Sequence, residues 1–210
     1  MSQTDDDLTR RTFTGLAGAG LVGLVAGCGP KAPSETGGET GTGSGDGGAG
    51  CDETPSDIEG PYYRDDMPER DDLDTLAEVG TRLTITGVVL GLDCLPIAGA
   101  RVDFWQADVA GAYDLESSAA NYYGYQVVDA KGRYALTTLV PGRYLNGGQY
   151  RPAHIHVKVF VDGVEQLTTQ LYFEGDPYNK LDPWWSAETT LTLDDDGSGG
   201  KITSFDFTVG

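Results

Sequence analysis

Short alternating runs of apolar and polar residues fill the chain from residue 82 onward, separated by Gly, Pro, Asn and Asp. A period of two is typical of strands with one buried face, and most of these runs are too short for helices. Asp162-Gly163 lies between two runs and is the strongest hairpin signal in the sequence. The pattern predicts an all-β fold, an antiparallel β-sandwich without a long helix. About eight strands are expected, at 83–90, 100–106, 123–128, 133–139, 154–161, 164–173, 188–193 and 202–209.

The region before the first predicted strand has no such period. Gly60-Pro61 forces a turn and presents the adjacent aromatic residues Tyr62 and Tyr63. The stretch from Asp65 to Glu78 is acidic and only weakly helical in pattern. We interpret this N-terminal part of the domain as an irregular segment that wraps around the surface of the sandwich.

The first 50 residues have the composition of a targeting segment and a linker. Arg10-Arg11 precedes an uncharged, glycine-diluted run at 15–27, which is too short for a permanent membrane span. Val25-Ala26-Gly27-Cys28 has the form of a lipobox, in which Cys28 carries the lipid. We predict a Tat-type lipoprotein signal peptide at 1–27, a flexible Gly/Ser/Thr tether at 28–50 and one folded domain at 51–210. The alternative is an ordinary secretory signal with a chance arginine pair.

Charge and targeting together restrict the partners and the location. A formal net charge of −19 would repel nucleic-acid phosphates and anionic lipid headgroups, so nucleic-acid binding is excluded. Contact with a membrane is expected only through the lipid on Cys28. The protein is predicted to be exported and held at the outer side of the cytoplasmic membrane, in the periplasm or at the cell surface.

The chain has three cysteines, and lipidation of Cys28 leaves Cys51 and Cys94. An even pair in an oxidising compartment predicts a disulfide. The bond would close a loop of 44 residues (51 to 94 inclusive) and stabilise the fold by about 3 to 4 kcal/mol. Two buried free thiols are the alternative.

The chain's two histidines, His154 and His156, open the predicted strand at 154–161. The period of two places both imidazoles on one face and Ile155 on the other, so both rings could reach one ion. An H-x-H pattern alone is more often a half-exposed strand. Arg151 three residues earlier, and the frequency of histidine among metal ligands, favour a metal site.

Tyrosines are the remaining candidate ligands. Tyr113 and Tyr144 each follow a predicted strand or turn, and two phenolates with two imidazoles suit ferric iron better than zinc. Most of the 11 tyrosines are expected to be strand or rim aromatics. By spacing alone, Tyr150 is as good a candidate as Tyr144.

Five segments in order resemble the intradiol ring-cleavage dioxygenase family. They are Glu59-Gly-Pro-Tyr-Tyr63, Trp105-Gln-Ala-Asp with Tyr113, Pro141-Gly-Arg-Tyr144, Arg151-Pro-Ala-His-Ile-His156 and Thr169-Gln-Leu-Tyr-Phe-Glu-Gly-Asp-Pro177. The resemblance extends from about Cys51 to the C-terminus, and five ordered motifs are far more specific than any one of them. It implies a β-sandwich that holds non-haem Fe(III) and cleaves catechol-type rings with O2 to muconate-type diacids.

The resemblance also implies a role for each matching residue. Its metal ligands fall on Tyr113, Tyr144, His154 and His156, which selects Tyr144 over Tyr150. Arg151 and Gln170 match residues beside the bound catechol, where Arg151 would stabilise negative charge on the ring, and Tyr144 would exchange a proton with the substrate. Gly60, Pro61 and Tyr62 would line the substrate site. The sequence has no counterpart of the helical dimerisation region of catechol-cleaving members, so no oligomeric state is predicted.

Two other functions remain open from the residues alone. Turn patterns such as 129–134 also occur in non-catalytic, transthyretin-like β-sandwich binding modules, and fold alone does not decide function. A module of that kind has no need for two histidines and two tyrosines to converge. An Fe(II) extradiol-type or cupin enzyme would need a carboxylate as third ligand, for which Asp162, in a turn, is a poor candidate.

Overall fold

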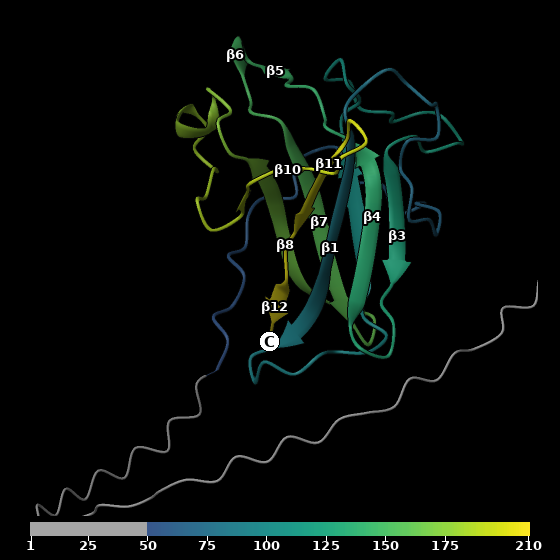
Figure 1. Cartoon of the computed structure of the whole chain (residues 1–210), viewed down its shortest axis with the longest axis vertical. Coiled ribbons are helices and arrows are strands. Elements are labelled where there is room, and N and C mark those ends of the chain that lie inside the picture. The colour runs from purple at the N-terminus through teal and green to yellow at the C-terminus, as the bar shows by residue number, and fades with distance from the viewer. Residues whose placement is uncertain (1–49) are drawn as a thin grey trace, which may run out of the picture. The chain divides into compact units, whose positions relative to one another are not determined.

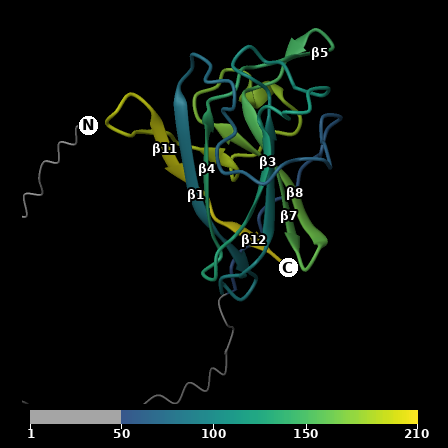
Figure 2. The ribbon, with the colours of Figure 1, turned by 90° about the vertical axis from the view of Figure 1, so that its right-hand side faces the viewer.

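A computed structural model describes residues 50–210, and nearly all regular structure in this range is β-strand. Two sheets pack face to face, with β1 and β4 on one side and β7 and β8 on the other (Figures 1 and 2). The first sheet has the order β3-β2-β7-β8-β9. Its strands are β2 (Arg101–Gln106), β3 (Tyr123–Val127), β7 (His154–Val161), β8 (Val164–Phe173) and β9 (Thr190–Leu191).

The second sheet is built around β1, which pairs with three other strands. A separate two-stranded hairpin, β5–β6, precedes β7, and one short 3-10 helix, η1, follows β8. The strands of the second sheet are β1 (Arg82–Gly91), β4 (Arg133–Leu139), β10 (Asp194–Asp195), β11 (Lys201–Ser204) and β12 (Phe207–Val209). The hairpin comprises β5 (Leu145–Asn146) and β6 (Gln149–Tyr150), and η1 covers Asn179–Leu181.

The predicted β-sandwich is confirmed, but the sheets are mixed. β11 and β12 run parallel to β1, and β9 runs parallel to β8. The predicted strand at 202–209 is divided at Phe205-Asp206, where the Asp206 carboxylate accepts the backbone N–H of Val88 at 2.8 Å. A side chain thus replaces the backbone partner and interrupts the ladder, which a period-two pattern does not reveal.

The main core lies between the two sheets. Ile155, Val157 and Val159 of β7 are fully buried in it, as are Leu83 and Ile85 of β1. Because side chains alternate across a strand, His154 and His156 must lie on the opposite face of β7, away from this core. A second cluster of Met67, Trp105, Ala120 and Tyr123 lies apart from the main core, packed with aromatic residues that include Tyr62 and Tyr113.

The segment before β1 wraps around the sandwich as predicted, although it is not confined to the surface. Leu73 is fully buried in the main core and Met67 is 5% exposed. Backbone hydrogen bonds fix the segment to both sheets, from Arg70 N to Tyr125 O and from Leu73 N to Thr137 O. The acidic residues around Met67 and Leu73 hid these two apolar positions in the sequence pattern.

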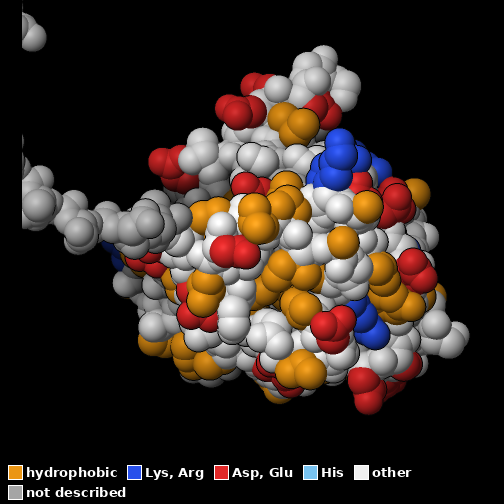
Figure 3. All heavy atoms as spheres, turned by 90° about the horizontal axis from the view of Figure 1, so that it is seen from below, with side chains coloured by type: hydrophobic (Ala, Val, Ile, Leu, Met, Phe, Trp, Pro, Cys, Tyr) orange, Lys and Arg blue, Asp and Glu red, His pale blue; other side chains and the backbone are white. Residues whose placement is uncertain are grey.

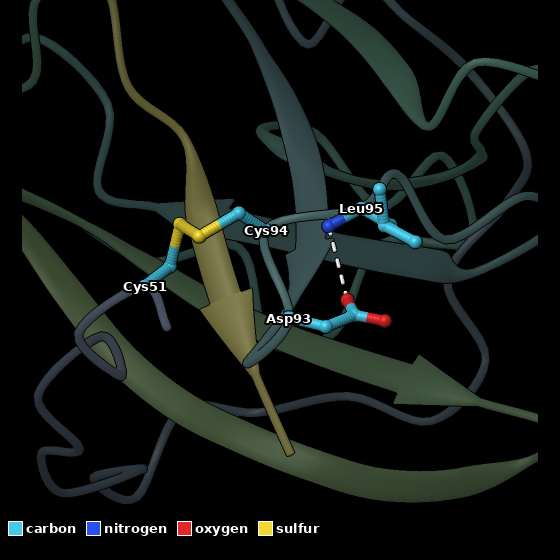
Figure 4. Close-up of a disulfide and its surroundings, with 4 residues drawn as sticks. All are labelled: Cys51, Asp93, Cys94 and Leu95. Atoms are coloured by element: carbon cyan, nitrogen blue, oxygen red, sulfur yellow. Dashed lines mark hydrogen bonds between the residues drawn. A yellow bond between two sulfur atoms is a disulfide. The ribbon is translucent and has the colours of Figure 1, made fainter. Parts of the chain in front are cut away.

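The predicted disulfide joins Cys51 and Cys94 across a Cα–Cα distance of 5.2 Å. It ties the start of the wrapping segment to the turn after β1 (Figure 4). The Asp93 carboxylate accepts the N–H of Leu95 at 3.0 Å, and Cys51 N donates to Leu92 O at 3.0 Å, so hydrogen bonds reinforce the covalent link.

Acidic side chains are scattered among hydrophobic ones on the end of the sandwich near the C-terminus (Figure 3). Within residues 50–210, no helix has the length and apolar character needed to cross a membrane. The predicted signal peptide (1–27), Cys28 and the predicted tether up to residue 49 lie outside the described residues.

Candidate metal and substrate site

Two imidazole nitrogens face each other at the start of β7. His154 Nε2 lies 3.1 Å from His156 Nε2, and both side chains are buried. The rings are on the face of β7 opposite Ile155, as the strand period predicted. Across the sheet, His156 pairs with Trp105 of β2 and Gln170 of β8, while His154 pairs with Tyr172.

Neighbouring groups fix the orientation and charge of both imidazoles. His154 Nδ1 lies 2.7 Å from the carbonyl oxygen of Pro152, which makes Nδ1 the donor and leaves the Nε2 lone pair directed at the cluster. His156 stacks on Trp105 with ring centroids 4.7 Å apart, and its Nδ1 is buried without a hydrogen-bond partner. Burial, assisted by the charge of Arg151, lowers the pKa of His154 to about 3. Burial and His154 likewise lower the pKa of His156, so both rings are neutral, the form that binds metals.

Tyr113 and Tyr144 lie beside these imidazoles. Tyr113 Oη is 3.4 Å from His154 Nε2, and the Tyr144 ring is 5.7 Å from the His154 ring and 5.6 Å from the Tyr113 ring. Tyr150 is half-exposed and its ring contacts Tyr178, so the fold distinguishes the two tyrosines that spacing could not. Burial raises the pKa of Tyr113 and Tyr144, and both phenols stay protonated unless a cation compensates the phenolate.

The wrapping segment lies against this cluster. Tyr62 stacks on Tyr113 at 4.2 Å and contacts Tyr144 edge-on at 5.7 Å. Gly60 adopts a positive φ of 72°, and a Cβ there would lie 3.4 Å from His156 Cε1. Pro61 is exposed and links the two contacts. Of the three predicted lining residues, Gly60 and Tyr62 therefore lie against the site, whereas Pro61 is exposed between them.

Arg151 is the buried cation of the site, and four hydrogen bonds hold it. Its Nε donates to Asp182 Oδ2 at 2.7 Å, and its Nη1 donates to Tyr144 Oη at 3.2 Å. Its Nη2 donates to Gln170 Oε1 at 2.8 Å and to Tyr172 Oη at 3.3 Å. Burial lowers the pKa of Arg151, but the bonds with Asp182 and Tyr144 raise it by more, so the guanidinium stays charged.

Gln170 is also fully engaged. Its Nε2 donates to the carbonyl oxygen of Ile58 at 3.0 Å, while its Oε1 accepts from Arg151 and Tyr172. Because the amide donates on one side and accepts on the other, it joins the wrapping segment to the guanidinium. The predicted pair of Arg151 and Gln170 is thus in contact and next to the tyrosines.

Three further residues of this region were missed from the sequence. Tyr172 lies two positions after Gln170 on β8, so strand periodicity could have indicated it. Asp182 contacts Arg151, and the Trp184 ring lies 4.7 Å from the guanidinium carbon. No local pattern indicates Asp182 or Trp184, since a loop brings them to Arg151 from more than 30 positions away.

The alternative carboxylate ligand is not near the imidazoles. Asp162 occupies the turn at the other end of β7 from His154, eight residues or about 26 Å away at roughly 3.3 Å per residue. A cleft of about 180 Å³ opens beside Arg151, lined also by Tyr150, Asp182 and Trp184. A larger cavity, about 580 Å³, is lined by other residues, among them Arg143 and Tyr178.

The donors at this site suit a metal that accepts oxygen and nitrogen ligands. Within residues 50–210, no three His, Cys, Asp or Glu side chains gather in a group able to hold a metal, so the imidazole pair has tyrosines as its neighbours instead. Two neutral imidazoles and two phenol oxygens form a largely buried set that is rich in lone pairs and has no positive charge of its own. A trivalent ion would supply that charge by converting the phenols to phenolates.

Comparison with known proteins gives consistent matches. A family model described as "Dioxygenase" matches residues 58–207. Catechol 1,2-dioxygenase 2 of Acinetobacter lwoffii is 36% identical over 145 residues, which cover 60% of this chain and 53% of that protein. Chlorocatechol 1,2-dioxygenase of Rhodococcus opacus is 31% identical over 188 residues, which cover 73% of this chain and 71% of that protein. The chain thus spans about half the length of the Acinetobacter lwoffii protein and 71% of the length of the Rhodococcus opacus protein.

Solved structures share the fold. The dioxygenase domain of a dioxygenase carbohydrate-binding protein fusion from Streptomyces sp. SirexAA-E superposes with a TM-score of 0.68 at 41% identity. That superposition covers 75% of this chain and 97% of the domain. The family match contains every residue of the site described above.

Proposed function

This chain belongs to the intradiol dioxygenase family, and we propose that it cleaves catechol-type rings between the two hydroxyl-bearing carbons with O2, giving muconate-type diacids. One observation carries the proposal. His154, His156, Tyr113 and Tyr144 come from three separate segments and lie together beside the buried Arg151. A non-catalytic sandwich module would have no use for this arrangement.

The four side chains are proposed to hold Fe(III), the metal expected from the family. His154 and His156 would bind through Nε2, and Tyr113 and Tyr144 through their phenolate oxygens. When bound, ferric iron would act as a Lewis acid that withdraws electron density from a chelated catechol and makes the ring reactive toward O2.

The surrounding residues supply binding, charge and proton transfer. Tyr144 Oη, which accepts a hydrogen bond from Arg151, is proposed to take a proton from an entering catechol hydroxyl. Arg151 and Gln170 form a fixed, hydrogen-bonded charge and dipole beside Tyr144, and such preorganised groups commonly contribute about 10²- to 10³-fold in rate. Tyr62, stacked on Tyr113, excludes water from one side.

The test is anaerobic titration of the iron-loaded protein with catechol, followed by air. We expect a visible tyrosinate-to-iron absorption band that shifts with catechol, and then an intradiol diacid as product. Tyr144→Phe should weaken the band and turnover, whereas Tyr150→Phe, a matched change at a half-exposed tyrosine, should preserve both. A colourless iron-loaded protein, or an extradiol product, would exclude the proposed chemistry.

Export and lipidation are proposed from the sequence at Arg10-Arg11 and Cys28. The bond between Cys51 and Cys94 supports the proposal, because disulfides persist mainly in oxidising compartments. Cys28→Ala should release the protein from membranes into the soluble exported fraction. Equal membrane association of this variant and the wild type would contradict lipid anchoring.

A further inference from the structure

One loop holds the guanidinium of Arg151 from two directions. Asp182 forms an ion pair with Nε at 2.7 Å, with Asp182 fully buried and Arg151 nearly so. The Trp184 ring covers the guanidinium, 4.7 Å from its central carbon. Nothing in the sequence marks Asp182 as part of the site, yet it is the closest charge to Arg151.

The loop is itself well fixed. Asp182 Oδ1 accepts the N–H of Trp184 at 3.0 Å, and the N–H of Asp182 contacts the carbonyls of Tyr178 and Asn179 at 3.1 Å. Both carboxylate oxygens are therefore used, one for Arg151 and one for the loop. Since Nε can face only Asp182, the two terminal nitrogens must face Tyr144 and Gln170.

The pairing also determines the charge that a substrate meets. Asp182 neutralises Arg151, so the guanidinium is not an open receptor for a second carboxylate. Arg64 and Lys158, two further cations with nearly buried side chains, are likewise paired, with Asp66 and with Glu59 and Glu165. A carboxylate on the catechol ring would lose its hydration without gaining an unpaired cation, which is strongly unfavourable.

We propose that Asp182 is a positioning and specificity-determining residue: it aims Arg151 at Tyr144 and Gln170, and by neutralising Arg151 it restricts the substrates to catechols without a ring carboxylate. This inference rests on the proposed function. Arg151 touches the reacting groups, and Asp182 acts through it.

Two substitutions separate position from charge. Asp182→Asn keeps the shape and, with its amide oxygen on Arg151 Nε, the bond that aims the guanidinium, while it removes the charge and the acceptor for the Trp184 N–H. Asp182→Ala removes the charge and both acceptors. Asp129→Ala is the control, because it deletes the carboxylate of another Asp–Arg pair, with Arg133, in the turn between β3 and β4. Each protein is iron-loaded and checked for folding by circular dichroism.

The probes are catechol and 3,4-dihydroxybenzoate, measured by turnover and by anaerobic binding. Asp182→Ala should lower kcat for catechol at least about tenfold, with a smaller change in KM, as expected for a misaligned transition-state group. Asp182→Asn should retain most of this kcat. Its anaerobic preference for catechol over 3,4-dihydroxybenzoate should fall about tenfold or more, because the Arg151 charge is no longer neutralised by a carboxylate. Asp182→Ala should also shift the tyrosinate band, since Arg151 donates to Tyr144.

An unchanged kcat in Asp182→Ala would overturn the positioning role, and an unchanged preference in Asp182→Asn would overturn the specificity role. If Asp182→Ala does not fold, Asp182→Asn still tests the specificity role and Asp182→Glu tests the positioning role. The longer side chain of Asp182→Glu should displace Arg151 and lower kcat. If the wild-type protein binds catechol but gives no product, the proposed function is rejected. The anaerobic affinities of wild type and Asp182→Asn would still test the specificity role of Asp182.

Discussion

Replacement of Arg151 by alanine tests the centre of the site in two independent ways. The substitution removes four hydrogen bonds and leaves the Asp182 carboxylate buried without a counter-charge. Removing one partner of a buried ion pair costs about 3 to 5 kcal/mol. A fixed donor at a reacting centre contributes about 10²- to 10³-fold to kcat. Both the free energy of unfolding and the turnover of catechol should therefore fall.

The bound iron should not be lost with the stability and turnover in Arg151→Ala. The four proposed iron ligands remain in Arg151→Ala, so the iron content should be unchanged. The absorption band should persist but shift, because Tyr144 loses the donor at 3.2 Å. Urea unfolding gives the stability, metal analysis gives the iron content and oxygen uptake gives kcat.

A double substitution and a control separate the two effects. Arg151→Ala combined with Asp182→Ala removes the unpaired carboxylate, so it should be more stable than Arg151→Ala alone while remaining inactive. Arg133→Ala removes an arginine whose Nε lies 2.8 Å from the Asp129 carboxylate, but both side chains of this pair are well exposed, at 61% and 41%. It should leave the free energy of unfolding nearly unchanged. Full activity in Arg151→Ala, or a double variant no more stable than the single one, would refute this account of the site.

Further predictions concern the disulfide, pH and the wrapping segment. Replacing Cys51 and Cys94 by serine should lower the free energy of unfolding by up to about 4 kcal/mol for a loop of this length, measured in urea, and a loss under 1 kcal/mol would contradict a structural role. The pKa of His154 is depressed to about 3 when folded, so metal-free protein should lose stability as pH falls from about 6.5 toward 3. His154→Gln should flatten that dependence. An unchanged dependence of the urea-derived stability on pH would show that folding does not depress the pKa of His154. Gly60→Ala should lower the free energy of unfolding by about 1 to 2 kcal/mol because of the positive φ at this position, and it should lower catechol turnover. A variant with the same kinetics as the wild type would disprove the effect on turnover.

Local patterns were sufficient for parts of the site. A strand repeats every two residues, so placing His154 and His156 together opposite Ile155 required no knowledge of the rest of the chain, and the structure confirms it. The turn at Asp162-Gly163 was equally local and lies between β7 and β8. Ordered motifs identified the family, which the comparisons show.

Other features depend on residues that are distant in the sequence. Spacing left Tyr144 and Tyr150 equivalent, and only the packing of the chain around β7 places Tyr144 beside His154 and turns Tyr150 toward Tyr178. The parallel pairing of β11 and β12 with β1 was likewise invisible, because a strand's side-chain period is the same in both directions.

The sequence by itself determined the β-sandwich, the imidazole pair, the disulfide partners and the family, since each follows from short-range periodicity, residue counting or motif order. Only the tertiary structure decided what surrounds Arg151. Asp182 and Trp184 reach it from a loop about 30 residues away, and an ion pair or ring contact across such a separation leaves no periodic trace in the chain. The physical reason is that charge pairing is set by distance in space, whereas the sequence records directly only distance along the backbone.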